Sequence, residues 1–145
     1  MHRIPVVKVE LVRERHLMSE YNRITCSEDV AKLLSVYLAG ADREHFVTLL
    51  LDTKHKVIGL NTASVGILDA SIVHPREVFK PAILAGAQAV IVGHNHPSGD
   101  PTPSTNDLQV TKRLVEAGKI IGIDVLDHIV VGHESYVSFL ERGLI

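Results

Sequence analysis

The strongest constraint on the fold is an apolar run over residues 89–93, which is followed by two histidines and then by a loop rich in glycine and proline. Because the run continues without a polar break, it predicts a strand that is buried on both faces of a sheet. Beyond the loop, apolar residues at helical spacing predict a helix from about Ser104 to Ala117, with Gly118 just past its end. A buried strand followed by a helix indicates a domain of the α/β class.

Two further helices are predicted from capping residues and periodicity. Ser27 is expected to be the N-cap of a helix that stops near Gly40, because two acidic residues follow it and apolar residues recur at helical spacing. A second helix is expected to open with Pro75 in its first turn and to end at Gly86. Pro81 lies inside this second pattern, so the helix should be kinked or split there.

Short apolar runs predict the strands. Residues 46–51 and 57–65 are separated by a polar stretch and are expected to form a β-hairpin. Residues 120–123 and 125–131 indicate two strands or one long bent strand, and residues 136–139 a last strand. The sum is a single mixed α/β (α+β) domain with a central sheet and helices packed against it.

The composition is compatible with one globular domain. With 145 residues, of which 46% are hydrophobic, the chain can bury a substantial core. A net charge of -2 argues against a broad nucleic-acid-binding surface. Cys26 is the only cysteine, which favours a reducing, cytoplasmic compartment, and no apolar segment is long enough to span a membrane. Residues 1–24 are expected to be an arm or an edge strand that precedes a domain over residues 25–145.

Two histidines at the end of the buried strand indicate a metal site. Side chains two residues apart in extended chain point to the same face, so His94 and His96 can converge while Asn95 faces away. A carboxylate from the following helix, Asp107, would complete three ligands, which suits a catalytic zinc ion with one position open for water. Asp100 in the intervening loop is a rival for the third ligand.

Other residues near this motif have structural alternatives. Ser104 and Asp107 could simply cap the helix, although a first-turn carboxylate can also bind an ion. By residue type, Glu44 is a candidate general base and Ser104 a candidate donor to an oxyanion. The metallo-β-lactamase pattern, the barrel amidohydrolases and the zinc deaminases, which also use histidine pairs, do not fit the residues that follow, the length or the single cysteine.

The pattern His-x-His, seven residues, Ser, two residues, Asp is the signature of the JAMM (MPN+) metalloproteases. The chain resembles in particular the bacterial RadC proteins, through residues 75–80, 93–99 and 127–132. This resemblance implies a single JAMM/MPN-like domain, with a curled mixed sheet flanked by helices and a distant similarity to the cytidine deaminases. RadC proteins usually begin with a DNA-binding helix-hairpin-helix region, for which this chain has no room.

The resemblance also implies roles for individual residues. One zinc ion per chain would be held by His94, His96 and Asp107, with Ser104 positioning water or the oxyanion and Glu44 acting as general acid and base. Asp127 and His128 are either supporting residues behind the metal or a polar pair at a strand end.

The expected function is therefore a zinc-dependent hydrolase of amide bonds, a metallopeptidase or isopeptidase acting on a protein or peptide. The alternative is a non-catalytic, zinc-stabilised interaction module associated with DNA repair or mobile elements. A metal-dependent nuclease is disfavoured by the charge balance and by a ligand set for one metal. An indirect link to DNA-repair complexes and a homodimer are compatible with the sequence; a membrane partner is not expected.

Overall fold

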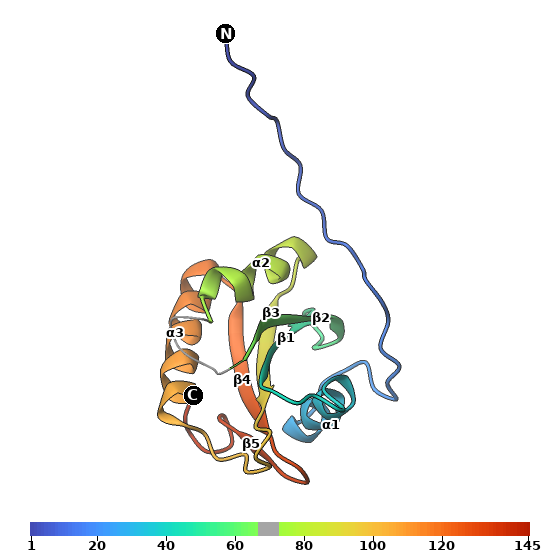
Figure 1. Cartoon of the computed structure of the whole chain (residues 1–145), viewed down its shortest axis with the longest axis vertical. Coiled ribbons are helices and arrows are strands. Elements are labelled where there is room, and N and C mark those ends of the chain that lie inside the picture. The colour runs from blue at the N-terminus through green and yellow to red at the C-terminus, as the bar shows by residue number, and fades with distance from the viewer. Residues whose placement is uncertain (67–72) are drawn as a thin grey trace.

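The computed structural model describes residues 1–66 and 73–145 and contains a five-stranded mixed sheet with helices on both faces (Figure 1). The strand order is β2-β1-β3-β4-β5, in which β3 and β4 are parallel and the other neighbours are antiparallel. The elements in chain order are α1 (Ser27–Tyr37), β1 (His45–Leu51), β2 (Val57–Val65), α2 (Pro75–Ala85), β3 (Ala89–Asn95), α3 (Thr105–Ile121), β4 (Asp124–Val131) and β5 (Tyr136–Ser138).

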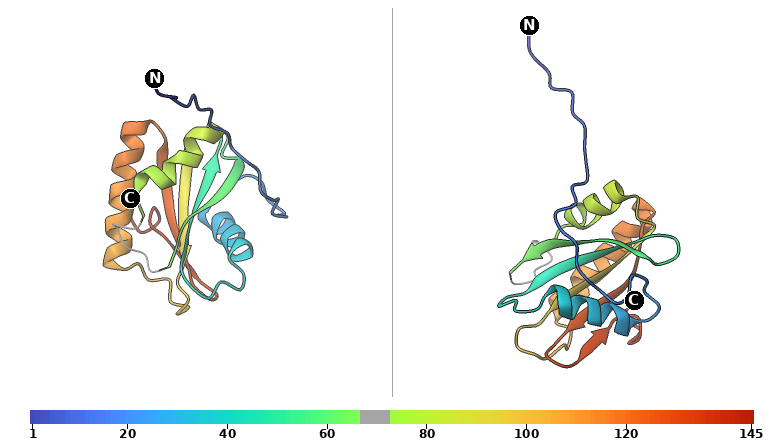
Figure 2. Two further views of the ribbon diagram at one scale, coloured as in Figure 1. Left: turned by 45° about the horizontal axis from the view of Figure 1, so that its top comes forward. Right: turned by 90° about the vertical axis from the view of Figure 1, so that its right-hand side faces the viewer.

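The sheet separates two apolar cores. Helices α2 and α3 cover one face and α1 covers the other, as Figure 2 shows. Alternation along β3 decides which core each side chain enters: Val90 and Val92 join the α2/α3 core, whereas Ile91 joins the α1 core. This confirms the expectation of a strand that is buried on both faces. The same alternation carries His94 to the α2/α3 face and Asn95 to the α1 face.

The strands β3 and β4 and the helix between them form a β-α-β unit. A parallel pair needs such a crossover, and α3 supplies it. The carboxyl end of β3 therefore meets the amino end of α3 at one edge of the sheet, joined by the loop over residues 96–104 (Figure 1). In open α/β sheets, this edge is where functional sites commonly lie.

The helix α3 is longer than predicted. It runs to Ile121 and is capped by Gly122 at a φ of 86°, so Gly118 is inside the helix and residues 120–121 are helical rather than extended. The helix ends at Gly122, whose left-handed backbone closes the last turn with an N–H bond to the Gly118 carbonyl. Gly118 is glycine for a different reason, because a Cβ atom there would lie 2.5 Å from the carbonyl oxygen of Ile123. Glycine at this position permits a tight helix end and does not mark the end itself.

The helix α1 begins one residue earlier than predicted. Cys26, not Ser27, is the N-cap, because the carboxylate of Asp29 reaches back to accept from the backbone N–H groups of Thr25 and Cys26 at 2.8 and 3.3 Å. The hydroxyl of Ser27 is instead turned towards Tyr136. In α2, Pro81 stays inside one helix of 11 residues, so the helix is not split.

The first 22 residues lie outside any helix or strand, and the N-terminal part of this segment runs out from the body of the protein (Figures 1 and 2). Their apolar side chains, such as Val6 and Val9, are exposed. The end of this segment contacts the domain: Leu17 packs against the α1 core, the Asn22 carbonyl accepts from the N–H of Val57 at 2.7 Å, and Arg23 forms a bridge with Lys56 at the tip of the β1–β2 hairpin. Within the described residues, none of the helices combines the length and the apolar character needed to cross a bilayer.

Candidate metal centre

Two imidazole rings meet at the carboxyl end of β3. His94 is completely buried, and the side chain of His96, one residue beyond the strand, keeps 13% of its surface exposed. Their Nε2 atoms lie 3.0 Å apart. The convergence that strand alternation predicts for His94 and His96 is therefore present in the fold.

The third group comes from the first turn of α3. Asp107 places Oδ1 3.2 Å from Nε2 of His94 and Oδ2 3.2 Å from Nε2 of His96. Its position is fixed by a capping box, in which Ser104 N–H donates to Oδ2 at 2.8 Å and Ser104 Oγ accepts from Asp107 N–H at 3.1 Å. The capping function and the approach to the histidines thus coexist in the same two residues.

The loop between the helix and the strand fixes the tautomer of His96. Its Nδ1 lies 2.8 Å from the backbone carbonyl oxygen of Asp100. A carbonyl oxygen can only accept, so Nδ1 carries the proton and Nε2 of a neutral ring has a free lone pair. The carboxylate of Asp100 accepts instead from the backbone and hydroxyl of Thr102, at 3.0 and 2.7 Å, so it does not take the place of Asp107.

The arrangement can accommodate a divalent metal ion. Nε2 of His96 and Oδ2 of Asp107 both present lone pairs to each other, and a cation between them would turn this repulsion into attraction. Two ligands at about 2.0–2.1 Å from a tetrahedral zinc are about 3.3 Å apart, close to the 3.0 and 3.2 Å separations observed here. Within the described residues, these three side chains are the group that could hold an ion.

The charge state of the centre suits metal binding. Burial raises the pKa of the Asp107 carboxyl, but the neighbouring His94 ring and the backbone N–H of Ser104 outweigh burial, so the net pKa lies well below its usual range. The group is therefore a carboxylate at neutral pH. One carboxylate and two imidazoles would offset half of a dication's charge, and the remainder is available to polarise a bound molecule.

A buried histidine and threonine lie behind His94. His128 on β4 places Nε2 2.7 Å from Nδ1 of His94, and its Nδ1 lies 2.5 Å from the hydroxyl of Thr111. Burial lowers the pKa of His128 well below its usual range, and the neighbouring His94 lowers it in the same direction, so the ring is neutral. Asp127, in contrast, accepts from Ser138 Oγ and the backbone of Leu140, and so holds the C-terminal turn.

The segment that carries Glu44 is tied to the same strand end. Asn95 accepts from the backbone N–H of His45 at 2.8 Å and donates to the carbonyl of Arg43 at 2.9 Å, one residue on each side of Glu44. Phe46 pairs with His94 in the antiparallel register, so β1 begins beside the end of β3 that carries the histidines. Glu44 immediately precedes β1 and is half-buried.

Sequence reasoning did not assign roles to Thr111 and Asn95. A signal for Thr111 was available, because it follows Asp107 by four residues and therefore lies on the same face of α3. The partnership of His128 with His94 depends on the parallel pairing of β4 with β3. That pairing cannot be read from the spacing of these two residues along the chain.

Comparisons with known proteins agree with this architecture. The family model described as "RadC-like JAB domain" matches residues 24–144. The protein named "UPF0758 protein" of Desulforamulus reducens is 56% identical over 122 residues, which are 84% of this chain and 54% of that protein. Its namesake in Geobacillus thermodenitrificans is 51% identical over 140 residues, 94% of this chain and 62% of that protein. The chain thus spans between about half and three-fifths of the length of these relatives.

Proposed function

The chain belongs to the RadC family through its RadC-like JAB domain, and from this premise we propose that it is a zinc-dependent hydrolase of amide bonds. The proposed substrate is a protein or peptide, as for a metallopeptidase or isopeptidase of the JAMM type. The observation that carries the proposal is the cluster of two Nε2 atoms and one carboxylate, with separations of 3.0–3.2 Å, at the carboxyl edge of the sheet.

His94, His96 and Asp107 are the proposed ligands of one zinc ion. Two imidazole nitrogens and a carboxylate oxygen are ligands that zinc accepts, and three protein ligands leave one position for water or substrate. Zinc in such a site supplies a Lewis acid and lowers the pKa of a coordinated water from 15.7 towards about 7. The partial exposure of His96, at 13%, and the complete burial of His94 mean that approach to the centre is from the side of His96.

Glu44 is the proposed general acid and base. Its carboxylate would accept a proton from the attacking water and return it to the leaving amine nitrogen. The support for this role is positional, because Asn95 holds the backbone on both sides of Glu44, next to the end of β3 that carries the histidines. A general base must be held within hydrogen-bond reach of the proton it moves, and this two-sided restraint limits the freedom of the segment.

Ser104 is the proposed donor to the developing oxyanion. Its Oγ accepts from the backbone of Asp107, which leaves the hydroxyl hydrogen available to donate elsewhere. Ser104 is exposed at the N-cap of α3, one turn before the carboxylate ligand, so a substrate carbonyl could reach it. One such donor contributes roughly a hundredfold to a thousandfold in rate at comparable sites.

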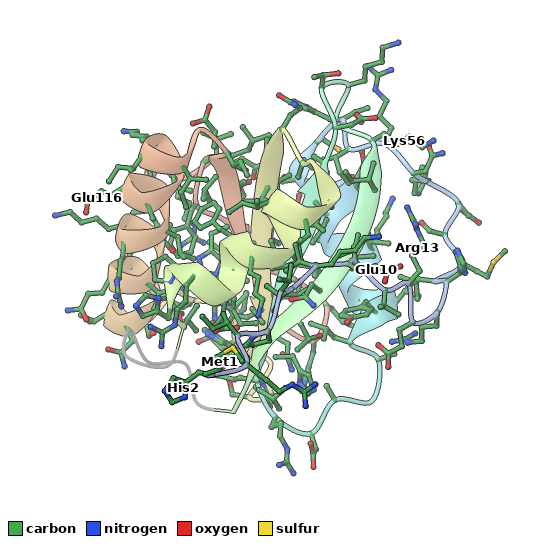
Figure 3. The ribbon with its side chains drawn as sticks, turned by 90° about the horizontal axis from the view of Figure 1, so that it is seen from above. Met1, His2, Glu10, Arg13, Lys56 and Glu116 are labelled. Carbon is green, nitrogen blue, oxygen red and sulfur yellow. The ribbon has the colours of Figure 1, made fainter. Side chains whose placement is uncertain are left out.

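The experiment uses zinc-loaded protein and a library of internally quenched peptides, with cleavage followed by fluorescence and product ends identified by mass spectrometry. Glu44→Gln should abolish cleavage while zinc content and fold remain, because the amide cannot accept the proton. Glu116→Gln is the matched control, since Glu116 lies on the outer side of α3 and points away from the sheet (Figure 3). Equal cleavage by wild type and Glu44→Gln, or none by the zinc-loaded wild type, would contradict the proposal.

A further inference from the structure

We propose that His128 and Thr111 are positioning residues that fix the tautomer of His94, so that its Nε2 lone pair faces the metal centre. The inference rests on the proposed function for its purpose, since a lone pair directed at the centre matters only if a metal ion binds there. It concerns the two side chains behind His94, whose contacts are all within the buried interior of the domain.

The direction of each hydrogen bond follows from the one before it. The hydroxyl of Thr111 donates to the backbone carbonyl of Asp107 at 2.7 Å, and a hydroxyl has only one hydrogen to give. Towards His128, 2.5 Å away, Thr111 Oγ1 can therefore only accept. This requires that the proton of the His128 ring resides on Nδ1.

The hydrogen bond between His128 and His94 then determines which nitrogen of His94 carries the proton. The His128 ring is completely buried and its two nitrogens contact only a hydroxyl and another imidazole, so it carries a single proton. With that proton on Nδ1, Nε2 has only a lone pair, which lies 2.7 Å from Nδ1 of His94. His94 must then donate from Nδ1, and its own Nε2 is left as an acceptor. That Nε2 atom is the one that lies 3.0 Å from His96 and 3.2 Å from Asp107.

The surroundings of His128 exclude other orientations of its ring. The ring is completely buried and stacks on Phe139, with centroids 4.5 Å apart, while Phe46 meets it edge-on at 5.5 Å. Rotating the ring would break both hydrogen bonds without water to replace them, and unpaired buried polar atoms are costly. The aromatic contacts therefore hold the ring in the plane that the chain of hydrogen bonds needs.

This series of hydrogen bonds begins and ends on residues of the metal centre. Its first acceptor is the backbone carbonyl of Asp107 and its last donor is His94, and the side chains of Thr111, His128 and His94 link α3, β4 and β3. His96 reaches the same tautomer by a different device, the carbonyl of Asp100. Both imidazoles thus present Nε2, and supporting groups of this kind commonly change metal affinity by roughly 10–100-fold when they are removed.

The test replaces Thr111 by Val, which keeps the shape but removes the hydroxyl, and by Ser, which restores it. Long-range ¹H–¹⁵N spectra of the metal-free protein report the protonated nitrogen of each histidine. In the wild type, His94 should carry its proton on Nδ1; Thr111→Val should give mixed tautomers at His128 and His94, and Thr111→Ser should return them to one. Thr105→Val, an exposed change in the first turn of the same helix, is the matched control.

Zinc affinity, measured by competition with a chromophoric chelator, is the second readout. Thr111→Val should weaken zinc binding by roughly tenfold or more and Thr111→Ser should recover it. A proton on Nε2 of His94 in the wild type would overturn the inference, as would a Thr111→Val protein with wild-type tautomers and an affinity within twofold. If the tautomers behave as stated but zinc-loaded protein cleaves nothing, the proposed function fails and this inference stands. Thr111→Val is a shape-preserving change, so the test does not depend on whether a His128 variant folds.

Discussion

Replacement of Asn95 by Ala tests how the Glu44 segment is held. The Asn95 amide makes two hydrogen bonds across to the start of β1, to the N–H of His45 at 2.8 Å and the carbonyl of Arg43 at 2.9 Å. Alanine removes both. Because Asn95 faces away from the metal centre, the change leaves His94 and His96 in place, and zinc affinity should stay at its wild-type value.

The expected loss of stability follows from those two bonds. A typical intramolecular hydrogen bond contributes about 1 kcal/mol net, and Asn95 is half-buried, so water can partly replace its amide. The free energy of unfolding should therefore fall by about 1–2 kcal/mol, which for a chain of this length lowers Tm by about 2–8 °C. The His45 amide should lose local protection, and each 1.4 kcal/mol of it corresponds to about tenfold faster hydrogen exchange.

Hydrogen exchange followed by NMR, with urea unfolding in parallel, measures both quantities. Asn106→Ala is the matched control, because Asn106 is exposed in the first turn of α3 and the same substitution there should change stability by no more than about 0.5 kcal/mol. Unchanged protection of the His45 amide in Asn95→Ala, or an equal loss of stability in both variants, would refute the idea that Asn95 holds the segment around Glu44.

Three other predictions concern the fold and the metal. Gly118→Ala should destabilise by about 1–3 kcal/mol in urea unfolding, because a Cβ atom 2.5 Å from the Ile123 carbonyl oxygen outweighs the gain in helix propensity of about 1 kcal/mol; a stabilised variant would contradict this packing. The Thr25 hydroxyl and N–H lower the pKa of Asp29, so its contribution is present above about pH 4 and is lost as pH falls through the folded-state pKa. Asp29→Asn should accordingly flatten the acid side of the stability profile, and an unchanged slope would argue against that capping interaction. Zinc at a hundredfold excess over Kd should raise the free energy of unfolding by about 2.7 kcal/mol and Tm by about 5–11 °C, and Asp107→Asn should lose most of this shift in differential scanning fluorimetry; an equal shift in that variant would exclude Asp107 as a ligand.

Local patterns predicted most elements of this fold. The apolar run of β3, the β1–β2 hairpin and the start of α2 at Pro75 were all expected, because each depends on neighbours in the sequence. The C-terminal end of α3 and the N-terminal start of α1 were not predicted correctly. Residue 118 is glycine inside the helix because the Ile123 carbonyl packs against it, and Cys26 takes the N-cap because the Asp29 carboxylate reaches back to its N–H. Such effects arise from contacts that a local pattern does not specify.

The contacts in the metal centre likewise include some that local sequence patterns predict and others that depend on the whole sheet. The approach of His94 to His96 follows from strand alternation, and that of Asp107 from its place in the first turn of a helix that starts beside them. The contact of His128 with His94 requires a parallel β3–β4 pair, which is a property of the whole sheet. The restraint on Glu44 likewise depends on β1 lying antiparallel to β3, and no spacing along the chain encodes it.

The most direct test of a metal-binding centre is the metal content of the purified protein. It is measured by inductively coupled plasma mass spectrometry after zinc has been supplied and unbound zinc removed. We predict about one zinc ion per chain for the wild type and a large loss in His96→Ala, whose fold should persist because His96 lies beyond the end of β3. Less than about a tenth of an equivalent in the wild type, or equal zinc in the variant, would contradict the assignment of His94, His96 and Asp107 as ligands.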